Sequence, residues 1–181
     1  GTGSFKEDDE GMPLHEANPL SFYTNAKILG EAMIRQRHAN HAILRIGPIY
    51  GQNCKGIWDK RISSMLEELK NGREITRTDN LFKTFVHVED LASAIHELIA
   101  SSFRGTLHLG PGEKESYYSF HRKVAEALHL DPHLVKKDIL SADEAKRRCI
   151  PMDTSLDTSR ARALLSSKFR PLTESVRTAL L

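Results

Sequence analysis

Apolar residues in this chain fall either at helical spacing or in short unbroken runs. Apolar side chains three and four residues apart predict helices over residues 22–37, 58–69, 91–99, 120–128, 157–165 and 172–180. Ser21 and Asp157 carry side chains suited to cap the first and fifth of these helices. Unbroken apolar runs predict buried strands over residues 42–46, 85–88 and 106–109.

The remaining segments separate these elements. Residues 1–19 are polar and turn-rich, so we expect an exposed loop there. Glu89 and Asp90 follow the second predicted strand as acids in the first turn of the next helix, where they suit the helix dipole. Strands alternate with helices along the chain, and this order predicts an α/β fold with a mostly parallel sheet.

Composition narrows the class of protein. The 181 residues are 39% hydrophobic and 28% charged, which is typical of a soluble globular protein. The net charge is only +2 and Lys and Arg are scattered, so we expect no nucleic-acid partner. No apolar run approaches the roughly 20 residues that a membrane helix needs. We therefore expect no membrane contact and a cytoplasmic location, with Cys54 and Cys149 as free thiols and no metal site.

Tyr23 and Lys27 are the pair most suited to chemistry. Their four-residue separation places them on one face of the predicted helix. A free tyrosine titrates near pH 10, and a nearby ammonium favours the phenolate and lowers that pKa. Such a tyrosine can exchange a proton with a carbonyl or hydroxyl oxygen. The same spacing also occurs on helix surfaces without any function, so the pair needs support from its surroundings.

Several ordered segments provide that support, because together they resemble the extended short-chain dehydrogenase/reductase family. Within that family the similarity is to the dTDP-4-dehydrorhamnose reductase-like and NAD-dependent epimerase-like branch. The similar segments, in chain order, are residues 18–31, 44–51, 85–92, 105–110, 155–161 and 169–172. They span nearly the whole chain, which makes the set far more specific than any one piece.

The resemblance implies a fold and an assignment of parts. It implies the C-terminal part of a Rossmann-type doubly wound parallel sheet, together with a small α/β substrate-binding subdomain. Residues 1–51 would complete the dinucleotide-binding domain with its catalytic helix. Residues 52–181 would form mainly the substrate-binding subdomain, with residues 84–101 packing back on the first part.

The resemblance also implies roles for single residues, with NAD or NADP as cofactor and a nucleotide-linked sugar as substrate. Tyr23 would exchange the proton, while Lys27 would lower its pKa and hydrogen-bond the cofactor ribose. Lys83 would contact the nucleotide diphosphate, where many relatives hold an arginine; a solvated lysine at a strand edge is the alternative. The cofactor-binding residues beside the nicotinamide would be Gly47, Pro48 and Ile49.

The chain departs from the family pattern in two places. The Gly-rich phosphate-binding turn is absent, because neither Gly1-Thr2-Gly3 nor Gly110-Pro111-Gly112 has the required setting. We therefore expect the isolated chain to bind NAD(P) poorly, to be inactive as an enzyme, and to expose apolar surface. Pro48 stands where dehydrorhamnose reductases have an aromatic residue against the sugar, so a broader nucleotide-sugar substrate is expected.

Three functions stay open at this point. The first is an NAD(P)-dependent reductase of a nucleotide-linked sugar. The second is an epimerase that oxidises and re-reduces one carbon, which a net change of cofactor redox state would distinguish from the reductase. The third is a non-catalytic regulatory subunit of the methionine adenosyltransferase beta type, for which Tyr23 would be dispensable. A homodimer or a partner subunit is compatible with each.

Overall fold

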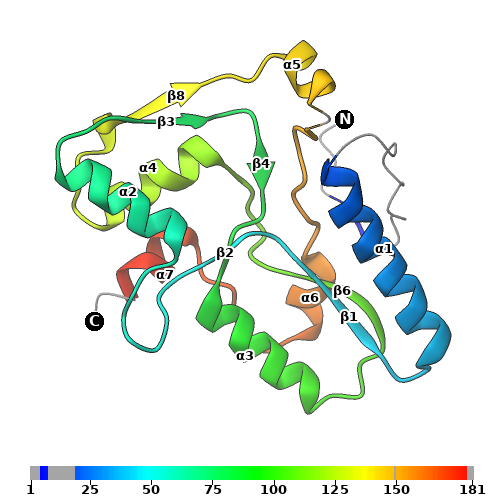
Figure 1. The fold of residues 1–181 in the computed structure, drawn as a ribbon. Helices are drawn as coiled ribbons and strands as arrows, with labels where there is room; N and C mark the ends of the chain where they lie inside the picture. The colour runs from blue at the N-terminus through cyan, green and yellow to red at the C-terminus, as the bar shows by residue number, and fades with distance from the viewer. Residues whose placement is uncertain (1–4, 8–18, 149, 179–181) are drawn as a thin grey trace.

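A computed structural model describes residues 5–7, 19–148 and 150–178 (Figure 1). The strands and helices alternate along most of the chain, and the α/β class predicted from the sequence is confirmed. The helices are α1 (Pro19–Arg37), α2 (Lys60–Lys70), α3 (Val88–Ile99), α4 (Tyr117–Ala127), η1 (Pro132–Leu134), α5 (Ala142–Arg147), α6 (Ser159–Leu164) and α7 (Leu172–Thr178). The strands are β1 (Ala42–Ile46), β2 (Ile49–Tyr50), β3 (Ile75–Thr78), β4 (Phe82–Lys83), β5 (Val86–His87), β6 (Gly105–Leu109), β7 (Glu115–Ser116) and β8 (Val135–Asp138).

The strands of the described residues associate in pairs. Strand β1 pairs in parallel with β6 along its whole length, from Ala42 opposite Gly105 to Ile46 opposite Leu109. Strands β2 and β5, and likewise β3 and β8, also pair in parallel, whereas β4 and β7 run antiparallel. Strand pairing among the described residues is therefore mostly parallel, as predicted, and each parallel pair joins segments more than 30 residues apart in sequence.

Two apolar clusters hold these elements together. One contains the buried faces of α2, α4 and α7 with β3 and β8, and the aromatic rings of Tyr50, Phe85 and Phe120 lie at its centre. The other joins β5, β6, α3 and α6 and is extended by Leu44 of β1. In Figure 1 the first group lies to the left and the second lies lower and to the right, beside α1.

Local side-chain contacts explain where the helices begin. Asp59 caps α2 by accepting the backbone N–H of Arg61, and Ser116 caps α4 by accepting that of Ser119. Two predicted caps differ from the structure. Ser21 is not at the N-cap position, because α1 already begins at Pro19. Asp157 accepts the N–H of Ser159, but the N-cap position of α6 belongs to Thr158.

Other predicted boundaries shift by a few residues. The strand expected over residues 85–88 contains Val86 and His87 only, and Val88 is already helical. Most of the loop expected over residues 1–19 lies outside the described residues, including Gly1-Thr2-Gly3. Within the described part, Phe5 forms a parallel bridge with Leu156, with backbone hydrogen bonds of 2.7 and 2.8 Å.

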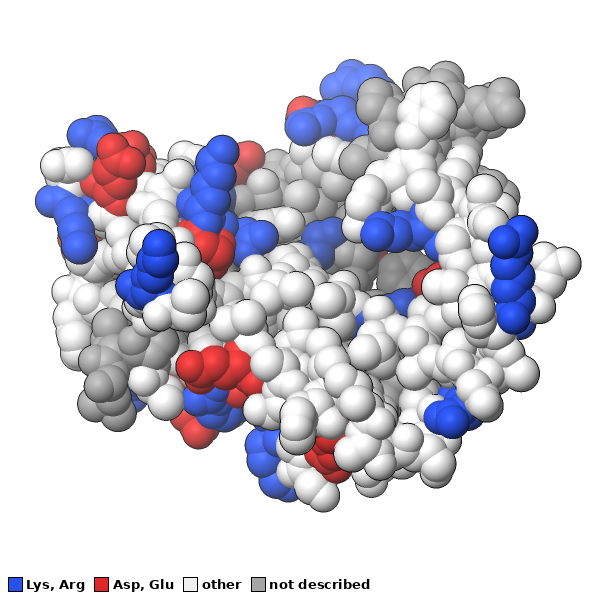
Figure 2. Space-filling view, turned by 60° about the horizontal axis from the view of Figure 1, so that its bottom comes forward, with Lys and Arg blue, Asp and Glu red and all other residues white. Residues whose placement is uncertain are grey.

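Charged and apolar residues are distributed unevenly over the surface. On the face shown in Figure 2, charged residues of both signs lie around a largely uncharged centre. Helix α1 exposes several large apolar side chains to solvent: Phe22, Tyr23, Leu29, Met33 and Ile34. Among the described residues, none of the helices combines the length and the hydropathy required to cross a bilayer.

Candidate active site

Tyr23 and Lys27 lie one turn apart on α1, as the sequence predicts. The Lys27 Nζ lies 5.4 Å from the centroid of the Tyr23 ring, within the range of a cation–π contact. Tyr23 is 67% exposed, so its hydroxyl is open to a ligand rather than buried in the core. The pair is thus assembled on one open face of the helix.

A charged network attaches α1 to β1 just after this pair. Glu31, one turn beyond Lys27, accepts hydrogen bonds of 2.9 Å from both Nε and Nη2 of Arg45 on β1. Arg35 also donates to Glu31, at 2.7 Å. The hydrogen bond from Arg45 is the main reason why the pKa of Glu31 lies below its usual value. This bidentate contact fixes the helix relative to the strand that leads into the next part of the site.

The loop after β1 is held close to neighbouring backbone. A Cβ added at Gly47 would lie 1.8 Å from the carbonyl oxygen of Thr84, so only glycine fits there. The Pro48 carbonyl accepts the backbone N–H of Val86 at 3.1 Å, and Ile49 and Tyr50 continue the pairing with β5. Ile49 remains 40% exposed. The predicted cofactor-binding residues therefore form a rigid segment that presents one apolar side chain outward.

Lys83 lies on β4 in a partly buried position. Its Nζ donates to Thr154 Oγ1 at 2.5 Å, and burial lowers its pKa while the nearby carboxylate of Asp153 opposes that shift. Asp153 is itself paired with Lys114, at 2.6 Å. Lys83 is consequently not a freely solvated surface lysine. Among the described residues, it also forms no ion pair of its own.

The structure links these residues through backbone rather than through direct contacts. Thr84, which packs on Gly47, follows Lys83 directly in the chain, so the loop and β4 are neighbours. The α1 pair is linked to the same loop by the Glu31–Arg45 contact, because Arg45 lies at the end of β1, two residues before Gly47. Among the described residues, no hydrogen bond joins Tyr23 to the loop or to Lys83.

The sequence matches the family described as RmlD substrate binding domain over residues 3–181. The chain belongs to this family. The dTDP-4-dehydrorhamnose reductase-like resemblance drawn from the sequence is thereby confirmed.

Solved structures of RmlD-family and related proteins share the fold. A hypothetical dTDP-4-dehydrorhamnose reductase from Sulfolobus tokodaii is 29% identical, with a TM-score of 0.71 over 96% of this chain and 57% of that one. A dTDP-4-dehydrorhamnose reductase from Clostridium acetobutylicum is 21% identical, with a TM-score of 0.76 over 99% of this chain and 60% of its own. The enzyme from Bacillus anthracis, in complex with NADP, is 20% identical, with a TM-score of 0.71 over 97% of this chain and 61% of that one.

Relatives in sequence include beta subunits of methionine adenosyltransferase 2. The methionine adenosyltransferase 2 subunit beta of Bos taurus is 25% identical over 153 residues, which are 81% of this chain and 45% of the relative. The Danio rerio protein of the same name is 25% identical over 171 residues, which are 90% of this chain and 52% of the relative. The chain thus spans about half the length of these relatives.

Several residues that shape this region were not singled out as site residues by sequence reasoning. Glu31 and Arg45 lie within the matched segments, but their contact depends on how α1 packs against β1. Asp90 was interpreted as a helix-dipole acid, yet it is buried and bonded to Arg170, 80 residues away. An acid just after a predicted strand, with an arginine in another matched segment, was the available signal.

Proposed function

We propose that this RmlD-family chain carries the catalytic helix and the substrate-binding part of an NAD(P)-dependent reductase that acts on a nucleotide-linked sugar. The observation that supports this most directly is the Tyr23–Lys27 pair, assembled on one open face of α1. The solved relative from Bacillus anthracis, which holds NADP, supports the choice of cofactor class.

The residues present fit such a cofactor. Ile49 offers an exposed apolar side chain beside a backbone that Gly47 allows to pass close to Thr84, and a flat nicotinamide ring suits such a surface. Lys27 offers an ammonium that can donate to ribose hydroxyls. When bound, the nicotinamide supplies the hydride, which no side chain can provide.

The chain's own residues handle the proton. Tyr23 donates its phenolic proton to the carbonyl oxygen of the sugar as that oxygen gains negative charge. The Lys27 ammonium, 5.4 Å from the centroid of the Tyr23 ring, attracts the negative charge that remains on Tyr23 after the transfer. Lys83 holds the diphosphate of the substrate by charge, and its single ammonium cannot form the two-pronged contact of an arginine.

The full-length protein tests this proposal. With NADPH or NADH and a nucleotide-linked 4-keto sugar, the wild type should oxidise the cofactor, and Tyr23→Phe should lower kcat about 100-fold or more through loss of the proton donor. Tyr118→Phe is the matched control, because Tyr118 lies on α4 and contacts Arg122 instead. Lys83→Gln should chiefly raise KM for the sugar. Equal kcat for wild type and Tyr23→Phe would refute the catalytic role.

An epimerase differs from this reductase because it causes no net oxidation of the cofactor. It would return the hydride to the same sugar, so the absorbance of the reduced cofactor at the end of the reaction would be unchanged. A wild-type protein that interconverts two sugar epimers without net oxidation of NADH or NADPH would therefore support this variant of the proposal over the reductase.

A regulatory role is the second candidate, and the methionine adenosyltransferase 2 beta subunits among the relatives favour it. In that case the protein would bind a methionine adenosyltransferase catalytic subunit and change its activity. Tyr23→Phe would leave both effects intact. Co-purification of the full-length wild type and of Tyr23→Phe with that subunit separates this role from the reductase.

A further inference from the structure

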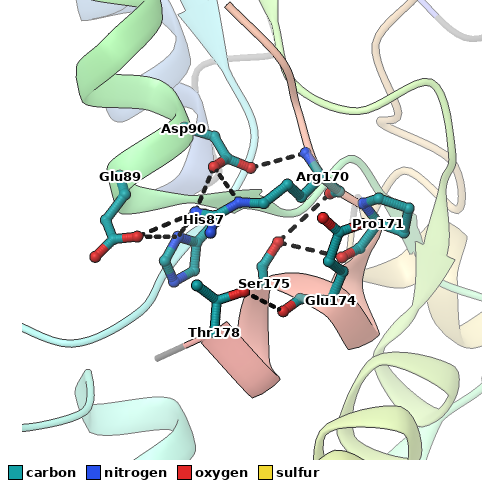
Figure 3. Close-up of polar contacts among 8 residues, drawn as sticks. All are labelled: His87, Glu89, Asp90, Arg170, Pro171, Glu174, Ser175 and Thr178. Carbon is teal, nitrogen blue, oxygen red and sulfur yellow. Dashed lines mark hydrogen bonds and ion pairs between the residues drawn. The ribbon is translucent and has the colours of Figure 1, made fainter. Parts of the chain in front are cut away.

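Arg170 is the centre of a partly buried polar cluster that joins two segments about 80 residues apart in the chain, residues 87–90 and the segment before α7 (Figure 3). It precedes α7, and its backbone N–H donates to Asp90 Oδ2 at 2.8 Å while its Nε donates to Asp90 Oδ1 at 2.7 Å. Its Nη2 donates to Glu89 at 3.0 Å and points at His87 Nδ1 at 3.2 Å. One guanidinium therefore contacts the end of β5 and the first turn of α3 together.

The contact with Arg170 determines the protonation of His87. A guanidinium can only donate, so Nδ1 of His87 must accept and the ring proton must reside on Nε2. The imidazole is almost completely buried, and no hydrogen-bond partner for Nε2 exists among the described residues. Burial lowers the pKa of His87, Asp90 and Glu89 oppose that shift, and Arg170 adds to it.

His87 in turn supports the loop at residues 47–51. Its ring meets the edge of Tyr50, with centroids 5.2 Å apart, and a Cβ added at Gly51 would lie 3.1 Å from Nε2. Gly51 has a φ of +136°, which favours glycine, and an added side chain there would also crowd the imidazole. Val86, the residue before His87, donates to the carbonyl of Pro48.

From this chain of contacts we infer that Arg170 is a positioning residue for the loop at residues 47–51, acting through neutral His87. The inference rests on the proposed function, in which this loop borders the nicotinamide. The segment before α7 thus holds the loop at residues 47–51 in place. The titratable or charged groups that face His87 from the elements packed against it are Tyr50 of β2, Glu89 and Asp90 of α3, and Arg170.

The matched control comes from the same segment. Glu97 on α3 accepts the backbone N–H groups of Ser166 and Ser167, at 2.7 and 2.8 Å, so it anchors this segment to the same helix. Neither serine touches His87 or the loop. Glu97→Gln therefore loosens the segment that contains Arg170 but leaves the His87 contact in place. If the role of Arg170 were merely structural, Arg170→Gln and Glu97→Gln would have the same effects.

The experiment compares Arg170→Gln, Arg170→Lys and Glu97→Gln in the full-length protein. Both Gln variants should lower Tm, but only Arg170→Gln should raise the Kd for NAD(P)H, about tenfold, as expected when a positioned group shifts by a fraction of an ångström. The rise should be larger at pH 6 than at pH 8, because without Arg170 the carboxylates of Glu89 and Asp90 favour protonated His87. Arg170→Lys should recover part of the affinity.

Hydrogen exchange at the Tyr50 and Gly51 amides supplies a readout that does not need the cofactor. These amides should exchange faster in Arg170→Gln than in Glu97→Gln. Equal exchange in the two variants, or an unchanged Kd in Arg170→Gln, would overturn the inference. A wild type that fails to bind NAD(P)H would overturn the proposed function alone, and the exchange data would still decide the role of Arg170.

Discussion

At Gly47, an added Cβ would collide with the carbonyl oxygen of Thr84, whereas at Gly30 on α1 nothing lies within 4 Å. The two glycines therefore have opposite requirements, although both lie in segments matched to the same family. The close approach at Gly47 involves backbone, which cannot rotate away as a side chain can. A sequence shows the glycine in both cases, but only the fold shows which one is obligatory.

Substitution by alanine separates these two glycines. Gly47→Ala should destabilise the protein by about 1–3 kcal/mol, because the loop or β4 must move to relieve the overlap. Gly30→Ala should stabilise it by about 0.5–1 kcal/mol, since alanine favours a helix and finds open space. Urea unfolding of the two variants beside the wild type measures both changes. A Gly47→Ala variant as stable as the wild type would contradict the close contact.

Asp90 shows that a sequence can predict the helical position of a residue but not its distant hydrogen-bond partner. Its position in the first turn of α3 was predicted correctly, and the helix dipole was a sufficient local reason for an acid there. The structure adds that Asp90 is buried and receives two hydrogen bonds from Arg170. Contacts between residues 80 positions apart leave no periodic trace in one sequence. The positions of Tyr23 and Lys27 were predictable because they share one helix.

At the scale of elements, apolar patterning was informative wherever a segment is buried. Strand β1 has the predicted bounds of residues 42–46, and its run of apolar residues explains why. Strands β3 and β8 were missed. Strand β8 reads Val-Lys-Lys-Asp, with Val135 buried and the other three exposed, so it carries too few apolar residues to be recognised. Its pairing with β3 stabilises it instead, and pairing is not local in sequence.

Glu31 offers a test of how α1 is attached. Glu31→Gln removes the carboxylate shared by Arg45 and Arg35, and we expect a loss of about 1–2 kcal/mol, typical of hydrogen bonds to a charged group at a partly buried site. Arg35→Gln, at the more exposed end of the network, should cost about 0.5 kcal/mol or less. Hydrogen exchange along α1 should accelerate in Glu31→Gln only. Equal exchange in both variants would show that packing alone holds the helix.

At the scale of the whole molecule, three buried histidines link stability to pH. Burial is the largest cause that lowers the pKa of His87, His108 and His121, and the pKa of His121 falls to about 4. The folded protein therefore binds fewer protons than the unfolded chain below the ordinary histidine pKa of about 6.5. These histidines do not reduce the free energy of unfolding above pH 6.5. They reduce it progressively as the pH falls from 6.5 toward 4.

His121→Asn isolates one of these contributions. Asn can keep a donor near the Tyr117 carbonyl, which the imidazole contacts at 2.7 Å through Nδ1, but it does not titrate. The free energy of unfolding should then decline less steeply between pH 6.5 and 5, by up to about 1.4 kcal/mol per pH unit. Urea unfolding at several pH values measures the slope, with His96→Asn on the exposed side of α3 as control. An unchanged slope in His121→Asn would contradict the assignment.

The lack of space for a side chain at Gly47 and Gly51 has a practical consequence for protein engineering. Between these two glycines, Pro48 is half-buried and Ile49 is 40% exposed. Under the proposed function, a combinatorial library aimed at altered sugar or cofactor preference should randomise these two codons and keep both glycine codons constant. Diversity would then be concentrated where the scaffold tolerates new side chains, and few clones would be lost to misfolding.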